Sequence, residues 1–201
     1  MTTPYTYISS SDYIKSLVFD YIETYSFQRG AAFEENEKMM KIEYDKLNAK
    51  KDKRNKLTVE EEKRFIELKE LVGYTQYLIN EKGQLHSSCK KINTINSNDS
   101  IVDSLKKILL IEAIEIPGWM CAPFYRDAIV FYNKENNIVS TLNVCLSCQY
   151  METKMFNHIN GDYKTYDLLK KLFIDIGHEV EDPNYSILDY INKEKLKYKT
   201  P

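Results

Sequence analysis

The chain has 201 residues, enough for one ordinary domain with a real hydrophobic core and no need of disulfides. Its 28 basic and 30 acidic residues nearly cancel, which excludes a global attraction to nucleic acid or to an anionic membrane. No run of about 18 uncharged apolar residues occurs, and the N-terminus lacks the features of a signal peptide, so we expect a cytoplasmic protein with no membrane partner.

The first predicted element is an amphipathic helix that begins after Ser10 or Ser11 and ends near Gly30. Asp12 lies in its first turn, where the helix dipole favours an acid. Apolar residues recur at helical spacing along the segment. They are Ile14, Leu17, Val18, Tyr21, Ile22 and Tyr25.

An antiparallel helical hairpin is predicted next. Its first helix runs from about Phe33 to Lys51, with acids early and lysines late. A capping box at Thr58-Val-Glu-Glu61 begins its second helix, whose apolar face continues to Ile79 before Gly83. The connection between the two helices is polar and short, as in a helical hairpin.

Residues 84–100 are rich in Ser, Asn, Lys and Thr, so we expect an irregular connection there, with at most a short strand. We place an internal seam of a single domain at this connection, between a helical half (1–83) and an α+β half (101–201). Residues 101–109 have helical spacing, although residues 109–116 also suit a strand.

A β-hairpin is predicted from strands at Asp127–Tyr132 and Ile138–Cys145, joined by an asparagine-rich turn that tolerates positive φ. The first strand is apolar on both faces, which indicates a central position. Helices follow from about Tyr166 to Gly177 and from about Ser186 to Leu196. The expected fold class is α+β, with N-terminal helices that include the helical hairpin, then a small antiparallel sheet built on the β-hairpin with flanking helices.

Three cysteines gather at one end of the predicted β-hairpin. Its expected register pairs Arg126 with Cys145. Cys148 then lies opposite Pro123 and diagonally near Cys121. Such a cluster has three interpretations: buried thiols that pack as small apolar residues, a zinc site, or a redox-active pair.

The zinc interpretation rests on the spacing of Cys145-Leu-Ser-Cys148, which is that of a zinc knuckle. Its four ligands would be Cys121, Cys145, Cys148 and His158, and a closed site of this kind would be structural. The redox interpretation rests on Arg126, which would favour the thiolate of Cys145. Zinc is the single cofactor that the sequence suggests.

Other candidate sites carry weaker signals. His86 and Cys89 lie in the polar connection, and His178 follows a helix end, where it is expected to cap free carbonyls. We find no nucleophile, base and orienting group among these positions. The basic run Lys46–Lys56 contains Asp52 and fits the solvated tip of the helical hairpin, so we do not expect nucleic-acid binding.

Three short motifs occur together in the second half of the chain. They are Ile129-Val-Phe-Tyr-Asn133, Val144-Cys-Leu-Ser-Cys148 and Phe173-Ile-Asp-Ile-Gly177. With Cys121 ahead of them, they resemble small uncharacterised proteins that are common in Bacteroidota genomes. The resemblance covers Cys121 to Gly177, implies the β-hairpin with its grouped cysteines, and implies no reaction.

We therefore expect a non-enzymatic protein-binding module, of the kind represented by immunity proteins and antitoxins. The cysteine hairpin would be a structural core, and the helical hairpin would present a partner surface. The 16 tyrosines favour this function because a rigid amphipathic ring loses little entropy on association. The alternative is a thiol-redox or zinc-binding protein that uses Cys121, Cys145 and Cys148.

Overall fold

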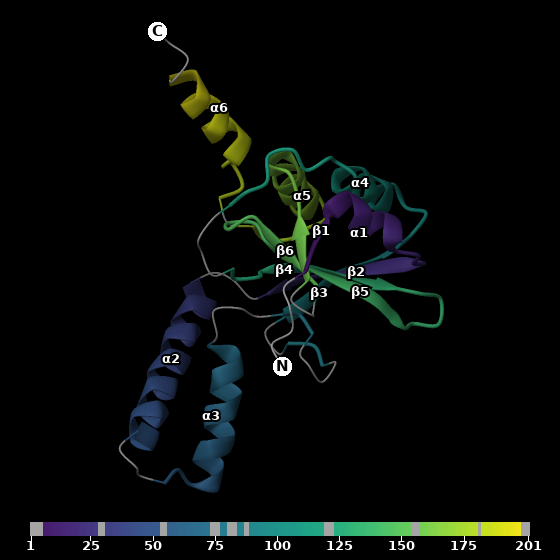
Figure 1. Ribbon diagram of the computed structural model, residues 1–201. Helices are drawn as coiled ribbons and strands as arrows, with labels where there is room; N and C mark the ends of the chain where they lie inside the picture. Colours follow the sequence, from purple (N-terminus) through teal and green to yellow (C-terminus); the bar gives the residue numbers. More distant parts are fainter. Residues whose placement is uncertain are drawn as a thin grey trace.

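The chain folds into a β-sheet with helices on one face and a projecting pair of helices (Figure 1). The structure is a computed structural model. The residues that it describes are 6–27, 31–52, 56–72, 77–79, 84–86, 89–118, 123–153, 157–180 and 182–197.

Among the described residues, the sheet has seven strands in the order β1-β7-β6-β5-β4-β2-β3. The strands are β1 (Thr6–Ser9), β2 (Tyr21–Phe27), β3 (Cys89–Asn96), β4 (Asp127–Tyr132), β5 (Ile138–Cys145), β6 (Tyr150–Glu152) and β7 (Asn157–Asn160). β1 and β7 are parallel, and all other neighbours are antiparallel. The α+β class is as predicted, but the sheet is larger than expected and is mixed.

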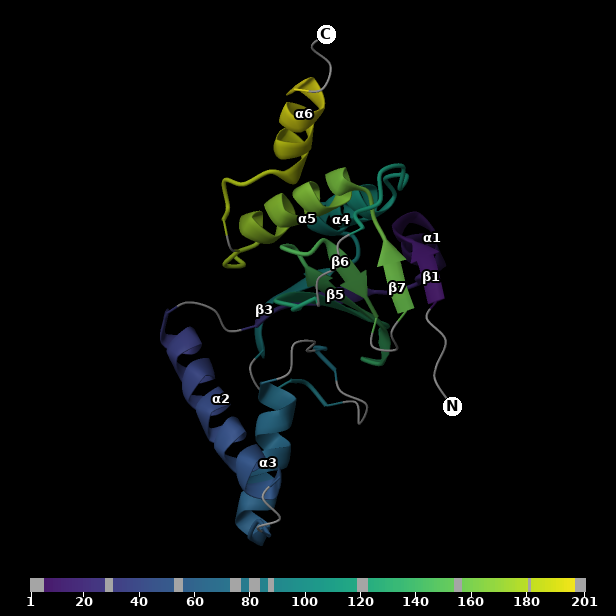
Figure 2. The ribbon, with the colours of Figure 1, turned by 60° about the vertical axis from the view of Figure 1, so that its left-hand side comes forward.

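Helices α1 (Ser10–Ser16), α4 (Ser100–Leu109) and α5 (Tyr163–Asp175) cover one face of the sheet. Helices α2 (Ala31–Asp52) and α3 (Val59–Leu71) form an antiparallel hairpin that projects from the other side (Figure 2). Helix α6 (Ile187–Lys197) projects beyond α5. The predicted helical hairpin, the helix before Gly177 and the last helix are therefore confirmed.

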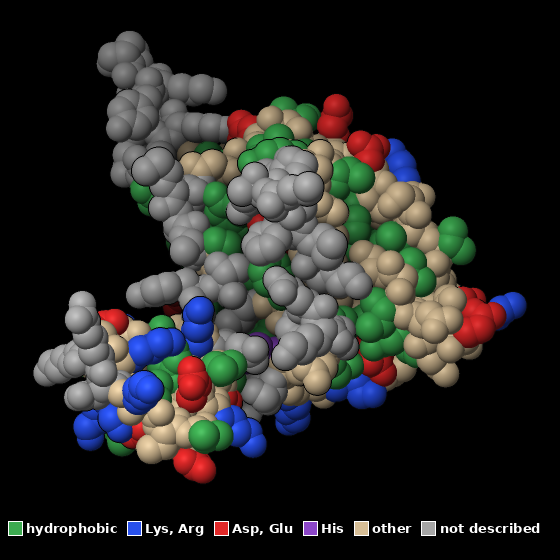
Figure 3. Space-filling model, turned by 60° about the horizontal axis from the view of Figure 1, so that its bottom comes forward, with side chains coloured by type: hydrophobic (Ala, Val, Ile, Leu, Met, Phe, Trp, Pro, Cys, Tyr) green, Lys and Arg blue, Asp and Glu red, His purple; other side chains and the backbone are tan. Residues whose placement is uncertain are grey.

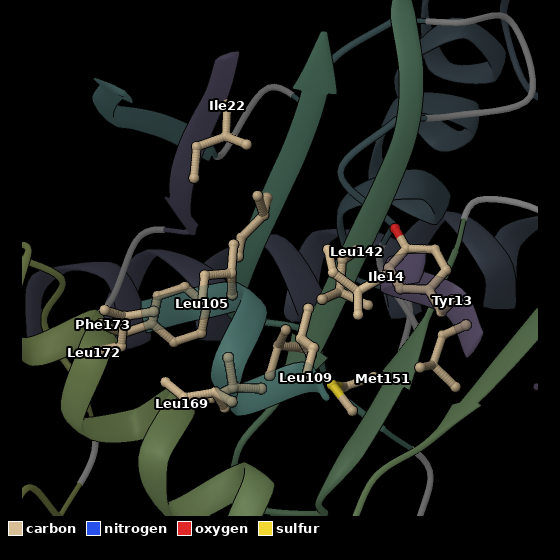
Figure 4. Packing of buried hydrophobic residues seen from close by; sticks show 14 of the residues in the cluster. Tyr13, Ile14, Ile22, Leu105, Leu109, Leu142, Met151, Leu169, Leu172 and Phe173 are labelled. Carbon is tan, nitrogen blue, oxygen red and sulfur yellow. The ribbon is translucent and has the colours of Figure 1, made fainter. Parts of the chain in front are cut away.

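The main core lies between the sheet and α1, α4 and α5 (Figure 4). Leu105 and Leu109 on α4 meet Leu169 and Phe173 on α5, and all four side chains are fully buried. Each buried side chain of this kind contributes about 1.5–3 kcal/mol to the free energy of folding, relative to leaving it exposed. The i, i+4 spacing of these pairs explains why both segments form helices against the sheet.

The face of the sheet turned away from α1, α4 and α5 is called the open face below. A second, smaller cluster covers part of it. Leu78 and Ile79, from the segment that follows α3, pack there with strand residues. The strand residues of this cluster are Tyr25, Phe27, Ala128 and Val130.

The helix predicted to begin after Ser10 or Ser11 and to end near Gly30 is wrong beyond Ser16. Helix α1 ends at Ser16, and Tyr21–Phe27 forms β2 between β4 and β3. The segment has period-two alternation as well as helical spacing, because Ile22 faces the main core while Tyr25 faces the open face. Pairing with two neighbouring strands decides in favour of the strand.

Two further boundaries differ from the prediction. Helix α3 ends at Leu71, so Leu78 and Ile79 do not continue its apolar face and pack on the sheet instead. The expected irregular connection contains β3, an eight-residue edge strand paired with β2. Here β pairing overrides the polar composition of the segment.

The predicted β-hairpin is confirmed at both strands. From Phe131 opposite Ser140 to Asp127 opposite Val144, the pairing follows the predicted register. A bulge displaces the last pair, so Tyr132 lies opposite Ile138 instead of Val139. Asn136 takes a positive φ of 63° in the turn, and β4 is central in the sheet, as expected.

Candidate functional site

Of the three cysteines in the predicted site, two lie within the described residues. Cys145 ends β5 and is 1% exposed, with its Sγ 3.4 Å from the Ser147 hydroxyl. Cys148 lies half-buried in the turn that leads to β6, and neither cysteine is in a disulfide. Cys121 lies outside the described residues, so its position relative to Cys145 and Cys148 stays a prediction.

The other residues of the zinc and redox interpretations have partners of their own. His158 lies on β7, with its Nδ1 3.8 Å from a carboxylate oxygen of Glu152. The Arg126 guanidinium lies 4.5 Å from the centre of the Phe124 ring. In the described part of the chain, no group of three or more His, Cys, Asp and Glu side chains is arranged to hold a metal ion.

Cys89 belongs to a different part of the sheet. It begins the edge strand β3, three strand spacings from β5. At about 4.8 Å per spacing this is ~14 Å from the strand that carries Cys145. His86 lies near it, with its ring 5.6 Å from the Phe27 ring.

A row of paired residues crosses the open face of the sheet. Because directly paired residues on neighbouring strands point to the same side, the register alone places these side chains in line. From β1 to β3 the row consists of Tyr7, His158, Glu152, Asn143, Ala128, Tyr25 and Lys91. Three neighbouring members, His158, Glu152 and Asn143, are polar and yet buried, which is uncommon for such side chains.

Glu152 is the charged centre of the row and is only 4% exposed. One carboxylate oxygen accepts a hydrogen bond from the Tyr77 hydroxyl, and the other faces His158. Burial alone would raise the pKa of Glu152, but His158 and two tyrosine hydroxyls lower it, so the net pKa lies below its usual value. Burial, with a further contribution from the same carboxylate, raises the pKa of the nearby Tyr125 hydroxyl.

The row also holds the segment that returns from the helical hairpin to the sheet. The backbone N–H of Leu78 donates to the Asn143 side-chain oxygen at 2.9 Å. The Asn143 amide donates in turn to the backbone oxygen of Glu152 at 3.1 Å. Tyr77, one residue earlier, donates to the Glu152 carboxylate. These buried contacts fix the base of the hairpin on the open face.

A second buried polar group lies on the other face, below the C-terminal end of α5. His178 Nδ1 lies 2.8 Å from Asp127 Oδ1, and Nε2 lies 3.0 Å from the Thr24 hydroxyl. The order of carboxylate, imidazole and hydroxyl is that of a catalytic triad. However, a nucleophile must reach its substrate, and none of the three side chains has exposed surface.

The Asp127–His178–Thr24 group instead ties the end of α5 to the sheet. Asn93 on β3 donates one amide N–H to Thr24 at 3.4 Å and lies 2.7 Å from the backbone oxygen of Ile176. Strands β2, β3 and β4 are thereby joined to the residues that follow α5. The predicted capping of free carbonyls by the His178 side chain is wrong, because the ring binds Asp127 and Thr24. The backbone N–H of His178 donates to the Phe173 oxygen.

The α2–α3 hairpin is the most independent part of the structure. Apart from each other, neither helix makes more than marginal contact with any other described element. Tyr44 and Phe65 stack between them at 5.2 Å, and Arg64 binds the Glu43 carboxylate at 3.1 and 2.8 Å. The predicted capping box is present, because Thr58 and Glu61 bond each other reciprocally.

The hairpin exposes apolar side chains on its outer surfaces. Met39 and Ile42 on α2 are 58% and 60% exposed, and Val59 and Ile66 on α3 are 81% and 55% exposed. In the view from the hairpin side, basic, acidic and hydrophobic side chains are interspersed there (Figure 3). This mixture suits a protein surface better than a polyanion, which requires concentrated positive charge.

Several of these residues have no signal in the sequence that singles them out. Glu152 and Tyr77 become neighbours only because the segment after α3 crosses the open face. Asp127 offers one clue, since a carboxylate at the start of a strand that is otherwise apolar needs a buried partner. That clue does not identify His178 as the partner.

Comparisons of the chain with protein-family models, with curated proteins and with solved structures give no match. The resemblance to Bacteroidota proteins therefore stays a prediction. Among the described helices, none combines the length and the hydropathy that a membrane span requires.

Proposed function

We propose that this protein is a non-enzymatic protein-binding module and that the α2–α3 hairpin is its binding surface. The observation that carries the proposal is the hairpin's isolation. The described residues of its two helices do not belong to either hydrophobic cluster on the sheet, and Met39, Ile42, Val59 and Ile66 are exposed. A segment that long does not stabilise the sheet by packing on it. Presenting side chains to another protein accounts for both its projection and its exposed apolar residues.

The internal contacts of the hairpin support this proposal. A helical pair that stands apart from the core loses affinity if it must be ordered at the moment of binding. The Tyr44–Phe65 stack and the Lys50–Glu61 ion pair at 2.6 Å hold the two helices together before any partner arrives. The binding surface is therefore preorganised.

The base of the hairpin supports it as well. Tyr77 and Leu78 are held by Glu152 and Asn143 on the open face, so the hairpin leaves the sheet from a fixed point. In this proposal the buried polar row is an anchor, and the cysteines at the end of β5 are part of the scaffold. An inhibitory complex of the kind formed by immunity proteins and antitoxins is the concrete form that we propose to test.

The test is co-expression with the products of neighbouring genes, scored for growth arrest that this protein relieves. A variant in which residues 31–72 are replaced by a flexible Gly/Ser linker keeps the sheet, because both hydrophobic cores lie outside that range. We expect this variant to remain folded by circular dichroism and to lose both the relief and the co-purifying complex. A folded variant without the hairpin that still relieves growth arrest would contradict the proposal.

A further inference from the structure

The outer side of α2 carries a second helical stripe besides the one that packs on α3. Its members follow one another at alternating spacings of four and three residues, as the a and d positions of a coiled coil do. They are Glu35, Met39, Ile42, Lys46 and Ala49, and all five are exposed. The stripe is thus apolar in its middle, acidic toward the N-terminal end and basic toward the C-terminal end.

This stripe is complementary to itself when two copies of α2 run antiparallel. With the two-fold axis between Met40 and Lys41, Met39 faces Ile42 of the second copy, and the reverse contact also forms. One helical turn outward on either side, Glu35 faces Lys46 of the second copy. An isologous interface requires such reciprocal contacts between residue pairs.

A parallel arrangement of the same stripe is unfavourable. It would place Glu35 against Glu35 and Lys46 against Lys46, and like charges that face each other oppose association. The antiparallel arrangement also brings Lys38 beside Asp45 of the second copy. Lys38 forms an exposed ion pair with Glu35 at 3.6 Å within the same helix, and such surface pairs are weak enough to rearrange.

The surface is accessible over the whole stripe. Figures 1 and 2 show α3 on one side of α2 and no other described element on the opposite side. Helix α2 has 22 residues, about 33 Å, so the four central layers of the stripe occupy roughly half of its length. A contact of this size is smaller than a standard stable interface, so the association is weak and depends on concentration.

We propose that α2 binds α2 of a second copy of this chain, antiparallel, through Met39, Ile42, Glu35 and Lys46. This inference rests on the proposed function of the hairpin as a protein-binding surface and names the occupant of one of its two sides. Val59 and Ile66 on α3 lie outside the α2 stripe and stay available to a different protein.

The test is the self-association of the purified full chain, measured by sedimentation equilibrium from ~10 μM to ~1 mM, a range that matches weak contacts. We expect wild type to associate reversibly and I42E to be monomeric throughout. The matched control is I66E, which places the same charge on an exposed isoleucine of α3 and keeps the association. Circular dichroism shows whether each variant retains its helices.

Charge exchange makes the test specific for the antiparallel pairing. E35K alone and K46E alone each create two repulsive pairs and weaken self-association about tenfold or more. The double variant E35K/K46E restores it. A mixture of E35K with K46E forms heterodimers in preference to either homodimer in native mass spectrometry, because both outer pairs are then attractive.

The inference is overturned if wild type stays monomeric over the whole range, if I66E weakens the association as much as I42E, or if mixed charge variants show no preference for heterodimers. None of these results contradicts the proposed function, provided that the hairpin is still needed for the complex with another protein. The proposed function is contradicted by a different result: a folded variant that lacks residues 31–72 and still forms that complex.

Discussion

The imidazole Nδ1 of His178 lies 2.8 Å from Oδ1 of Asp127, and neither side chain has any exposed surface. Removing one partner leaves the other buried without this contact, which typically costs about 3–5 kcal/mol. We therefore expect D127A and H178A each to lower the free energy of unfolding by about 3–5 kcal/mol in urea titrations. E179A, at an exposed neighbouring position, is the control.

The double variant D127A/H178A separates the pair from its surroundings. If the two side chains act on each other, its cost is clearly less than the sum of the single costs. Additive costs within about 0.5 kcal/mol would mean that each residue acts through other contacts.

Gly177 follows α5 with a φ of +88°, a conformation that disfavours any residue with a Cβ. A Cβ at this position would meet nothing closer than Ile92 Cγ2 at 4.0 Å, so the cost of G177A comes from the backbone alone. We expect G177A to destabilise the protein by about 1–2 kcal/mol in thermal or urea unfolding. G118A is the matched control because a Cβ there meets nothing within 4 Å and no positive φ occurs. Equal costs for both variants would contradict this account of the helix end.

The pKa of Glu152 lies below its usual value because His158 and two tyrosine hydroxyls outweigh the effect of burial. The folded state therefore holds the ionised carboxylate more strongly than the unfolded chain does. This contribution to stability is present above the unfolded pKa, near 4.3, and is lost as the pH falls through the lower folded pKa. We expect E152Q to flatten the decline of unfolding free energy below about pH 5.

Y77F provides a second variant for the same group, because it removes one donor to Glu152 and keeps the ring. The decline of its unfolding free energy at acid pH should be intermediate between the declines of wild type and E152Q. If E152Q and wild type lose stability in parallel from pH 6 to pH 3, the carboxylate does not act as described.

The thiols offer a test of the cysteine interpretations. Cys145 is 1% exposed and Cys148 is half-buried, so we expect Cys148 to react with iodoacetamide well before Cys145 in the folded protein. Mass spectrometry of peptides from the alkylated chain measures how far each cysteine has reacted. Bound zinc or an internal disulfide in native mass spectra of fresh protein would instead support the alternative function through Cys121, Cys145 and Cys148.

Local signals in the sequence predict the elements that local contacts form. The capping box at Thr58, the asparagine turn before Ile138 and the glycine after α5 each mark a boundary that the structure confirms. The register of β4 and β5 follows from their short turn, apart from one bulge at Tyr132. Such features depend on residues close in sequence.

The remaining parts depend on pairing between distant segments. Tyr21–Phe27 suits a helix by spacing and becomes a strand because β4 and β3 flank it. His158 and Glu152 meet across β6 and β7, and Tyr77 reaches them from the hairpin's return segment. No pattern within one segment encodes these contacts, so the polar row was not predictable from the sequence.

The central claim is that the α2–α3 hairpin is the protein-binding surface, and site-specific photo-crosslinking in living cells tests it most directly. A photoreactive residue at Ile66 samples the exposed side of α3, and one at Val139 samples an exposed strand position on β5 outside the hairpin. We predict a discrete crosslinked protein from position 66 and none from position 139. A discrete adduct from position 139, with none from position 66, would contradict the account.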